Sequence, residues 1–274
     1  MHYLGSDICC FVLYHVARYR RKVVRDNLVQ SFPEKSAQEI KKIEKQFYHN
    51  FCDLVAETLK LRRMNTAEVL QHVTLTNPEL LETLSLKGRS VLLATQHSSN
   101  WEWLWQIQHT VSTHRHYAVY KRLENRFFDR KVFQLRTRFA NGQEVMIEDR
   151  AVKEVMPRIE GTTNAILLLG DQSPKGADTD YWTDFLHRDT CWYTGLEKLA
   201  RKYDYAVVYA EMIRTQRGRY AVTFKMICED PKTMGEGVIL EQYVRQVERF
   251  IQNQPDNWLW SHRRWKHSRK QQAS

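Results

Sequence analysis

The chain has 274 residues, and its 42 Lys and Arg against 32 Asp and Glu give a formal net charge of +10 at pH 7. A hydrophobic fraction of 42% with only 10 Gly and 6 Pro excludes disordered and collagen-like sequence. The sequence contains no apolar run long enough for a complete membrane span. The excess of positive charge indicates an anionic partner, which at this stage is nucleic acid, an acidic protein or anionic lipid.

Residues 4–19 form an apolar segment that is interrupted by Asp7, His15 and Arg18 and followed by a basic cluster at residues 20–22. The segment is too short to cross a bilayer and lacks the small-residue cleavage site of a secretory signal. Two interpretations stay open. The segment is either an ordinary amphipathic helix packed on the core, or a membrane-associated helix with its cations at the level of the lipid headgroups.

The pattern of apolar residues predicts helices first and then alternating strands and helices. Apolar steps of three and four predict a helix over residues 37–63, begun by a Ser cap, and a short helix over 80–86. Strands are then expected at 90–95, 116–120, 144–147, 165–170, 206–213, 220–227 and 258–261, and helices at 125–140, 151–160, 194–203 and 236–253. This order predicts an α/β fold with a mixed, mostly parallel central sheet flanked by helices. We expect one domain, with a helical N-terminal section (1–86) and an α/β catalytic core (87–274).

His97 lies in the turn after the predicted strand 90–95, and Glu102 falls in the first turn of the next helix. Functional groups of α/β sheets gather beyond the carboxyl ends of the strands. The spacing allows the carboxylate to return to the imidazole, which would give a base able to take a proton from an alcohol. The alternative is structural: His97 ends a strand and Glu102 favours the helix N-terminus.

The segment 97–102 resembles the His-x4-Asp/Glu motif of the glycerolipid acyltransferase superfamily. Its surroundings resemble one branch, the lipid A biosynthesis acyltransferases that add late lauroyl or myristoyl chains, and within it a Bacteroidetes-type subgroup. The similarity extends in order over about residues 18–267, in the blocks 20–34, 47–57, 119–125, 136–139, 170–174, 194–200 and 258–266. The family normally begins with a longer apolar segment, so the resemblance implies either a downstream start or a weaker anchor here.

The resemblance implies transfer of an acyl chain from acyl carrier protein to a hydroxyl of a phosphorylated glycolipid, without an acyl-enzyme and without a cofactor or metal. His97 would be the general base and Glu102 its partner. Substrate-binding roles would fall to a group of polar residues in the later blocks: Lys121 (where the family often has Arg), Arg122, Arg136, Arg138, Asp171 and Gln172. The alternatives are a solvated basic helix face for the four cations and a simple turn for Asp171 and Gln172.

Other functions compete with this interpretation. The acceptor could be another lipid, such as an aminolipid or a lysophospholipid, and the chain could be an inactive lipid-binding scaffold, which an intact His97–Glu102 pair disfavours. A nucleic-acid-binding protein would fit the basic tail at 263–270, but no signature of such a domain occurs and we expect no nucleic-acid partner. We expect an enzyme on the cytoplasmic face of the inner membrane, peripheral or anchored by its N-terminal segment.

Overall fold

A computed structural model of the chain describes residues 3–108, 114–140, 145–159, 161–174 and 181–269. Its centre is a seven-stranded sheet in the order β1-β9-β8-β2-β5-β3-β4, and two further strands, β6 and β7, pair on their own. The strands are β1 (Val73–Leu75), β2 (Val91–Thr95), β3 (Arg115–Tyr120), β4 (Met146–Glu148), β5 (Asn164–Leu169), β6 (Tyr181–Asp184), β7 (Asp189–Trp192), β8 (Ala206–Gln216) and β9 (Arg219–Cys228). In the large sheet, β8 and β9 are antiparallel and all other pairs are parallel, which confirms the predicted fold class.

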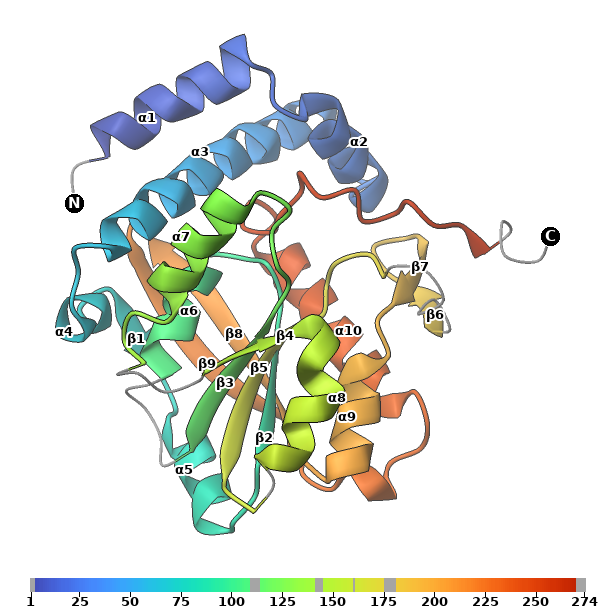
Figure 1. Cartoon of the computed structure of the whole chain (residues 1–274). Helices are drawn as coiled ribbons and strands as arrows, with labels where there is room; N and C mark the ends of the chain where they lie inside the picture. The colour runs from blue at the N-terminus through green and yellow to red at the C-terminus, as the bar shows by residue number, and fades with distance from the viewer. Residues whose placement is uncertain (1–2, 109–113, 141–144, 160, 175–180, 270–274) are drawn as a thin grey trace.

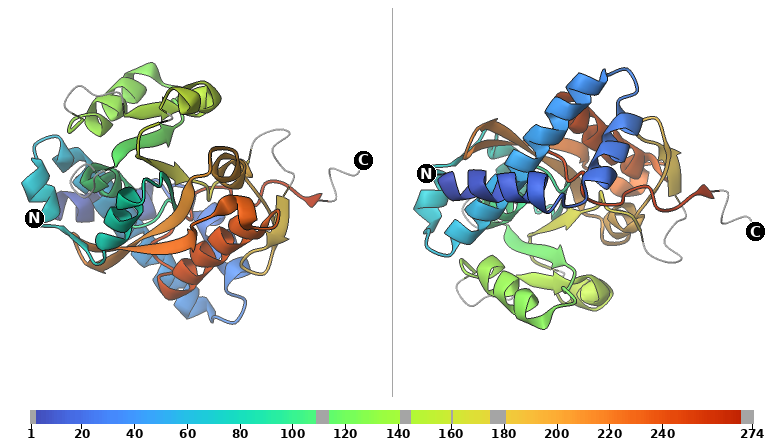
Figure 2. Two further views of the ribbon diagram at one scale, coloured as in Figure 1. Left: turned by 90° about the horizontal axis from the view of Figure 1, so that it is seen from below. Right: turned by 90° about the horizontal axis from the view of Figure 1, so that it is seen from above.

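Helices cover both faces of this sheet and one of its ends (Figures 1 and 2). They are α1 (Leu4–Phe11), continued by a π-helix (Val12–Val16), α2 (Arg21–Ser31), α3 (Ala37–Leu61), α4 (Thr66–Leu70), α5 (Glu79–Leu86), α6 (Trp101–Gln108), α7 (Arg126–Arg136), α8 (Val152–Val155), α9 (Gly195–Tyr203) and α10 (Val238–Asn253), with short 3-10 turns at Asp149–Ala151, Met156–Arg158 and Pro231–Thr233. Helices α1, α2 and α3 lie across the end of the sheet opposite α5 (Figure 1). Within the described residues, no helix is both long and apolar enough to cross a lipid bilayer.

Local sequence signals explain where the main elements begin and turn. Helix α3 starts at a capping box, in which the Ser36 hydroxyl accepts from the Glu39 backbone N–H and the Glu39 carboxylate accepts from the Ser36 N–H. The β8–β9 hairpin turns at Gly218, whose φ of +73° favours glycine. The first of these signals confirms the predicted Ser cap.

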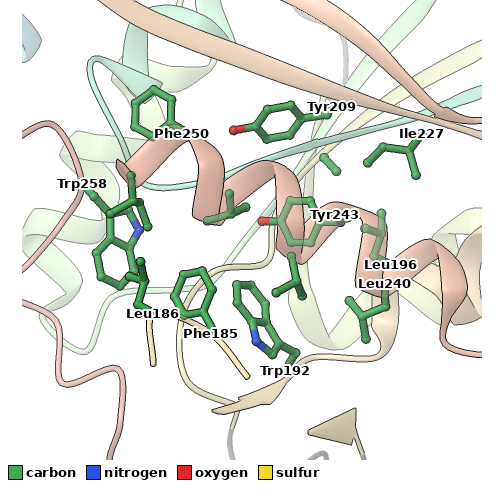
Figure 3. Packing of buried hydrophobic residues seen from close by; sticks show 14 of the residues in the cluster. Phe185, Leu186, Trp192, Leu196, Tyr209, Ile227, Leu240, Tyr243, Phe250 and Trp258 are labelled. Carbon is green, nitrogen blue, oxygen red and sulfur yellow. The ribbon is translucent and has the colours of Figure 1, made fainter. Parts of the chain in front are cut away.

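The central strand β2 is buried along its whole length, as a parallel strand covered on both faces should be. Its side chains alternate: Leu92 and Ala94 join the hydrophobic cluster under α9 and α10, whereas Val91 and Leu93 join the cluster under α5 and α6. The first cluster is dense in aromatic rings, with Tyr243 of α10 packed among them (Figure 3). The sheet is therefore held rigidly from both sides.

Two expectations differ from the structure. The N-terminal section is not purely helical, because β1 pairs with β9 and adds an edge strand to the sheet. Residues 258–261 form no strand; Trp258 makes one isolated bridge to Ser98, because its chain follows the turn after β2 rather than a sheet edge. The strand expected at 144–147 begins, and the helix expected at 151–160 ends, outside the described residues, at Glu144 and Glu160.

Candidate active site

His97 sits in a tightly fixed turn between β2 and α6. The backbone N–H of His97 donates to the Asp171 carboxylate at 3.0 Å, and its carbonyl accepts from Leu259 N–H at 3.1 Å. Ser99, two residues on, has a left-handed backbone (φ +52°), which is strained for a residue with a side chain. Its N–H donates to the Asn257 carbonyl and its hydroxyl to the Met212 carbonyl. These bonds hold the turn in a conformation that it would not adopt alone.

The imidazole of His97 is paired with a carboxylate from the neighbouring strand. Asp171 follows β5, which lies beside β2, and its Oδ1 is 2.6 Å from His97 Nδ1. Asp171 Oδ2 accepts from Trp258 Nε1 at 2.8 Å. Burial by itself would raise the pKa of Asp171, but the facing His97 and the hydrogen bonds from His97 and Trp258 outweigh it and hold that pKa below its ordinary value.

An ionised Asp171 determines which ring nitrogen of His97 carries the proton. Nδ1–H donates to the carboxylate, so Nε2 presents its lone pair, the arrangement of a general base oriented by an acid. The Gln172 amide nitrogen lies 3.3 Å from Nε2, and the His97 side chain is 20% exposed, so a substrate hydroxyl can reach it. The arrangement can therefore take a proton from an alcohol.

Glu102, the partner that the sequence spacing indicates for His97, is bound elsewhere. Its two oxygens accept from Arg136 Nε at 2.9 Å and Nη2 at 2.5 Å, a bidentate ion pair, and from Trp101 Nε1 at 3.1 Å. Successive residues of a helix are rotated by about 100°, and it is Trp101 whose ring faces the imidazole, at 5.4 Å between centroids. Glu102 consequently points toward the end of α7, and the position beside His97 Nδ1 belongs to Asp171.

The remaining predicted substrate-binding cations are more scattered. Lys121 and Arg122 follow β3 at the same edge of the sheet and are exposed; Arg122 forms an ion pair with Glu148. Arg138 instead donates to the Leu61 carbonyl at the end of α3, at 3.1 Å. The structure thus brings together His97, Asp171 and Gln172, sets the Glu102–Arg136 pair beside them behind Trp101, and turns Arg138 away.

Residues that the sequence interpretation gave no role complete the site. Tyr243 of α10 donates to the Thr95 carbonyl at 2.5 Å and accepts from Gly170 N–H at 3.3 Å, so it joins the ends of β2 and β5 (Figure 3 shows its ring). A Cβ on Gly170 would lie 3.2 Å from that ring, so a larger residue would require the ring to move by a few tenths of an ångström. Trp258, which donates to Asp171, is the second such residue. The sequence signal that could have identified it is its position in the last block that resembles the family.

Comparison with known proteins adds a finding over nearly the whole chain. A family model described as bacterial lipid A biosynthesis acyltransferase matches residues 3–267. That range includes the turn with His97, the Asp171 and Gln172 pair, and the Trp258 segment. No match was found among curated proteins.

Proposed function

Because the chain belongs to the bacterial lipid A biosynthesis acyltransferase family and is therefore an acyltransferase, we propose that it moves a fatty acyl chain from acyl carrier protein to a hydroxyl of a phosphorylated lipid A precursor. The observation that carries the mechanism is the short hydrogen bond between His97 Nδ1 and Asp171. It leaves Nε2 as the acceptor at the exposed side of the ring.

The proposed reaction is direct transfer of one acyl group from the thioester sulfur of the donor to the hydroxyl oxygen of the acceptor. His97 Nε2 accepts the hydroxyl proton as the acceptor oxygen attacks the thioester carbonyl, and Asp171 stabilises the imidazolium that forms. The tetrahedral intermediate then expels the thiolate, which takes the proton from Nε2. We assign Gln172, whose amide nitrogen lies 3.3 Å from Nε2, as a side-chain donor for the negative oxygen of the intermediate.

The charge of the protein suits both proposed substrates. The acceptor carries phosphate and the carrier protein is acidic, and the chain bears a net charge of +10. Lys121 and Arg122, exposed at the end of β3, are the cations that we assign to the phosphate. Both Arg122 and Arg136 form ion pairs, but the Arg136–Glu102 pair is bidentate and far less exposed than the Arg122–Glu148 pair, so we assign it to the wall of the site rather than to an anion.

We also propose that helix α1 holds the enzyme at the cytoplasmic face of the inner membrane. The helix docks on α3 through polar groups: Ser6 donates to Asp53 and Tyr3 to Glu57. On the outer surface of α1 and the π-helix that continues it, five large apolar side chains are exposed, Leu4, Ile8, Phe11, Val12 and Val16, together with Gly5, Cys9 and His15. A helix that turns its polar face to the protein and its apolar face outward is suited to a lipid surface, and the cations of residues 18–22 follow it.

The acceptor is tested by mass spectrometry of lipids from a deletion strain. We expect lipid A species that lack one acyl chain, restored by the wild-type gene and not by a His97→Ala variant. Unchanged lipid A together with loss of an acylated aminolipid or phospholipid would move the activity to the other acceptor. Unchanged lipids of every class would contradict the proposal.

A further inference from the structure

Glu57 of α3 is a buried carboxylate without a role in the reaction described above. It lies in one of the sequence blocks that resemble the family, and its side chain is fully buried. Three neutral groups donate to it: Tyr3 Oη at 2.8 Å, Tyr220 Oη at 2.7 Å and Asn100 Nδ2 at 2.7 Å. A buried ionisable group is costly unless its hydrogen bonds are complete, so this one is held in place by a specific set of partners.

One of those partners belongs to the catalytic turn. Asn100 follows Ser99 and starts α6: its Oδ1 accepts from the Trp103 backbone N–H at 3.0 Å, while its Nδ2 donates to Glu57. Asn100 is fully buried, so its amide has no water to replace a lost acceptor. Glu57 therefore fixes the orientation of the side chain that connects the His97 turn to the first turn of α6.

The strain in this turn makes such an anchor useful. Ser99 holds its left-handed conformation through bonds to β8 and to the C-terminal segment, and Asn100 is the point where the turn is tied to α3. If that tie is released, the turn can relax and move the imidazole relative to Asp171. Displacements of about 1 Å at a reacting group cost on the order of 100-fold in rate.

We propose that Glu57 is a positioning residue of the acyl-transfer reaction: its carboxylate, through Asn100, holds the His97 turn in the geometry that the reaction needs. The inference rests on the proposed role of His97. The same carboxylate also accepts from Tyr3, the residue that immediately precedes α1, so one side chain contacts both the start of the proposed membrane helix and the His97 turn.

Two substitutions separate hydrogen bonding from charge. In Glu57→Gln the amide oxygen can accept from Asn100 and Tyr220 while the amide nitrogen donates to Tyr3 Oη, so the network survives. Glu57→Leu removes every acceptor. Glu57→Leu also leaves the hydroxyls of Tyr3 and Tyr220 without an acceptor. The triple variant Tyr3→Phe/Tyr220→Phe/Glu57→Leu removes both hydroxyls, so that only the Asn100 amide loses its partner.

The role of Glu57 is tested by measuring kcat and KM for acyl transfer in these variants, together with the NMR resonance of the His97 Nδ1 proton. We expect the Gln variant to keep kcat within about threefold, and the Leu and triple variants to lose on the order of 100-fold in kcat, with KM within about twofold and a shifted Nδ1 resonance. The inference is overturned if the folded triple variant keeps its kcat, if the loss falls on KM, or if Gln fails as badly as Leu.

The resonance also separates this inference from the proposed function. It reports the geometry of the turn without any substrate. If the wild-type enzyme does not acylate a lipid A precursor, but the Leu variant shifts the resonance and the Gln variant does not, the acceptor is wrong and the role of Glu57 stands. If neither variant shifts it, the role of Glu57 is refuted whatever the acceptor is.

Discussion

Replacing Asp171 by Asn tests which carboxylate orients the catalytic base. Three donors meet Asp171: His97 Nδ1–H on one oxygen, and His97 N–H with Trp258 Nε1–H on the other. An Asn side chain keeps only one acceptor. If the Asn amide nitrogen faces the His97 N–H and the Trp258 indole, both of these donors lose their acceptor. If the nitrogen faces His97 Nδ1, only the contact with Nδ1 changes.

The second orientation forces His97 into the other tautomer, because Nδ1 must then accept and the proton moves to Nε2. The lone pair that should take the substrate proton is lost. We expect kcat to fall on the order of 10³- to 10⁴-fold, which corresponds to about 4–5.5 kcal/mol of lost transition-state stabilisation. Thermal stability at pH 7 should change little by comparison, since the Asn retains two of the three bonds.

Two readouts distinguish this account from one in which Glu102 orients His97. The first is kcat for acyl transfer, and the second is the tautomer of His97, read from its imidazole ¹⁵N shifts. Asp171→Asn should switch the tautomer, whereas Glu102→Gln, which alters only the contact with Arg136 and Trp101, should leave Nδ1 protonated. The reverse result, a switch in Glu102→Gln and none in Asp171→Asn, would show that Glu102 and not Asp171 orients the imidazole.

Two further outcomes are expected. The double variant Ile8→Glu/Phe11→Glu should lower the affinity for phosphatidylethanolamine/phosphatidylglycerol vesicles, measured by co-sedimentation, by at least about 30-fold, because the two half-exposed side chains are worth about 1–2 kcal/mol each on transfer to lipid. Leu86→Glu, at the far end of the molecule and 87% exposed, is the matched control. An equal loss of affinity in both variants would exclude α1 as the docking element. Burial is the main cause that lowers the pKa of His262 to about 4, so near pH 6.5 the unfolded chain binds a proton that the folded protein does not bind. The free energy of unfolding should therefore fall by up to about 3 kcal/mol as the pH drops from 6.5 to 4. In urea unfolding, His262→Gln should show a shallower fall, and the same pH dependence in both proteins would be the contrary result.

The order of strands and helices could be predicted because each central strand is a short apolar run bounded by turn residues. The strand ending at Thr95 and the one ending before Gly170 are parallel neighbours, and this placed His97 and Asp171 at the same edge of the sheet. What periodicity could not supply is the pairing of short or distant segments. The edge strand β1 has only three residues, and β6 and β7 pair with each other outside the large sheet.

The partner of His97 could not be derived from spacing along the chain. A separation of five residues brings Glu102 near the turn, but the phase of α6 directs Trp101 to the imidazole and Glu102 to Arg136. Asp171 is 74 residues away in sequence, and Trp258, which completes its hydrogen bonds, is a further 87. Such contacts depend on the register of the sheet and on the path of the C-terminal segment, both of which are settled by tertiary packing.

The most direct test of the account is an in vitro assay with acyl-acyl carrier protein, a phosphorylated lipid A precursor, and either the wild-type enzyme or a His97→Ala variant. With the wild-type enzyme we expect a product heavier by one acyl group. With the folded variant, kcat should fall by at least about 10²-fold, the typical contribution of a positioned general base. Full activity without the His97 imidazole would exclude His97 as the general base.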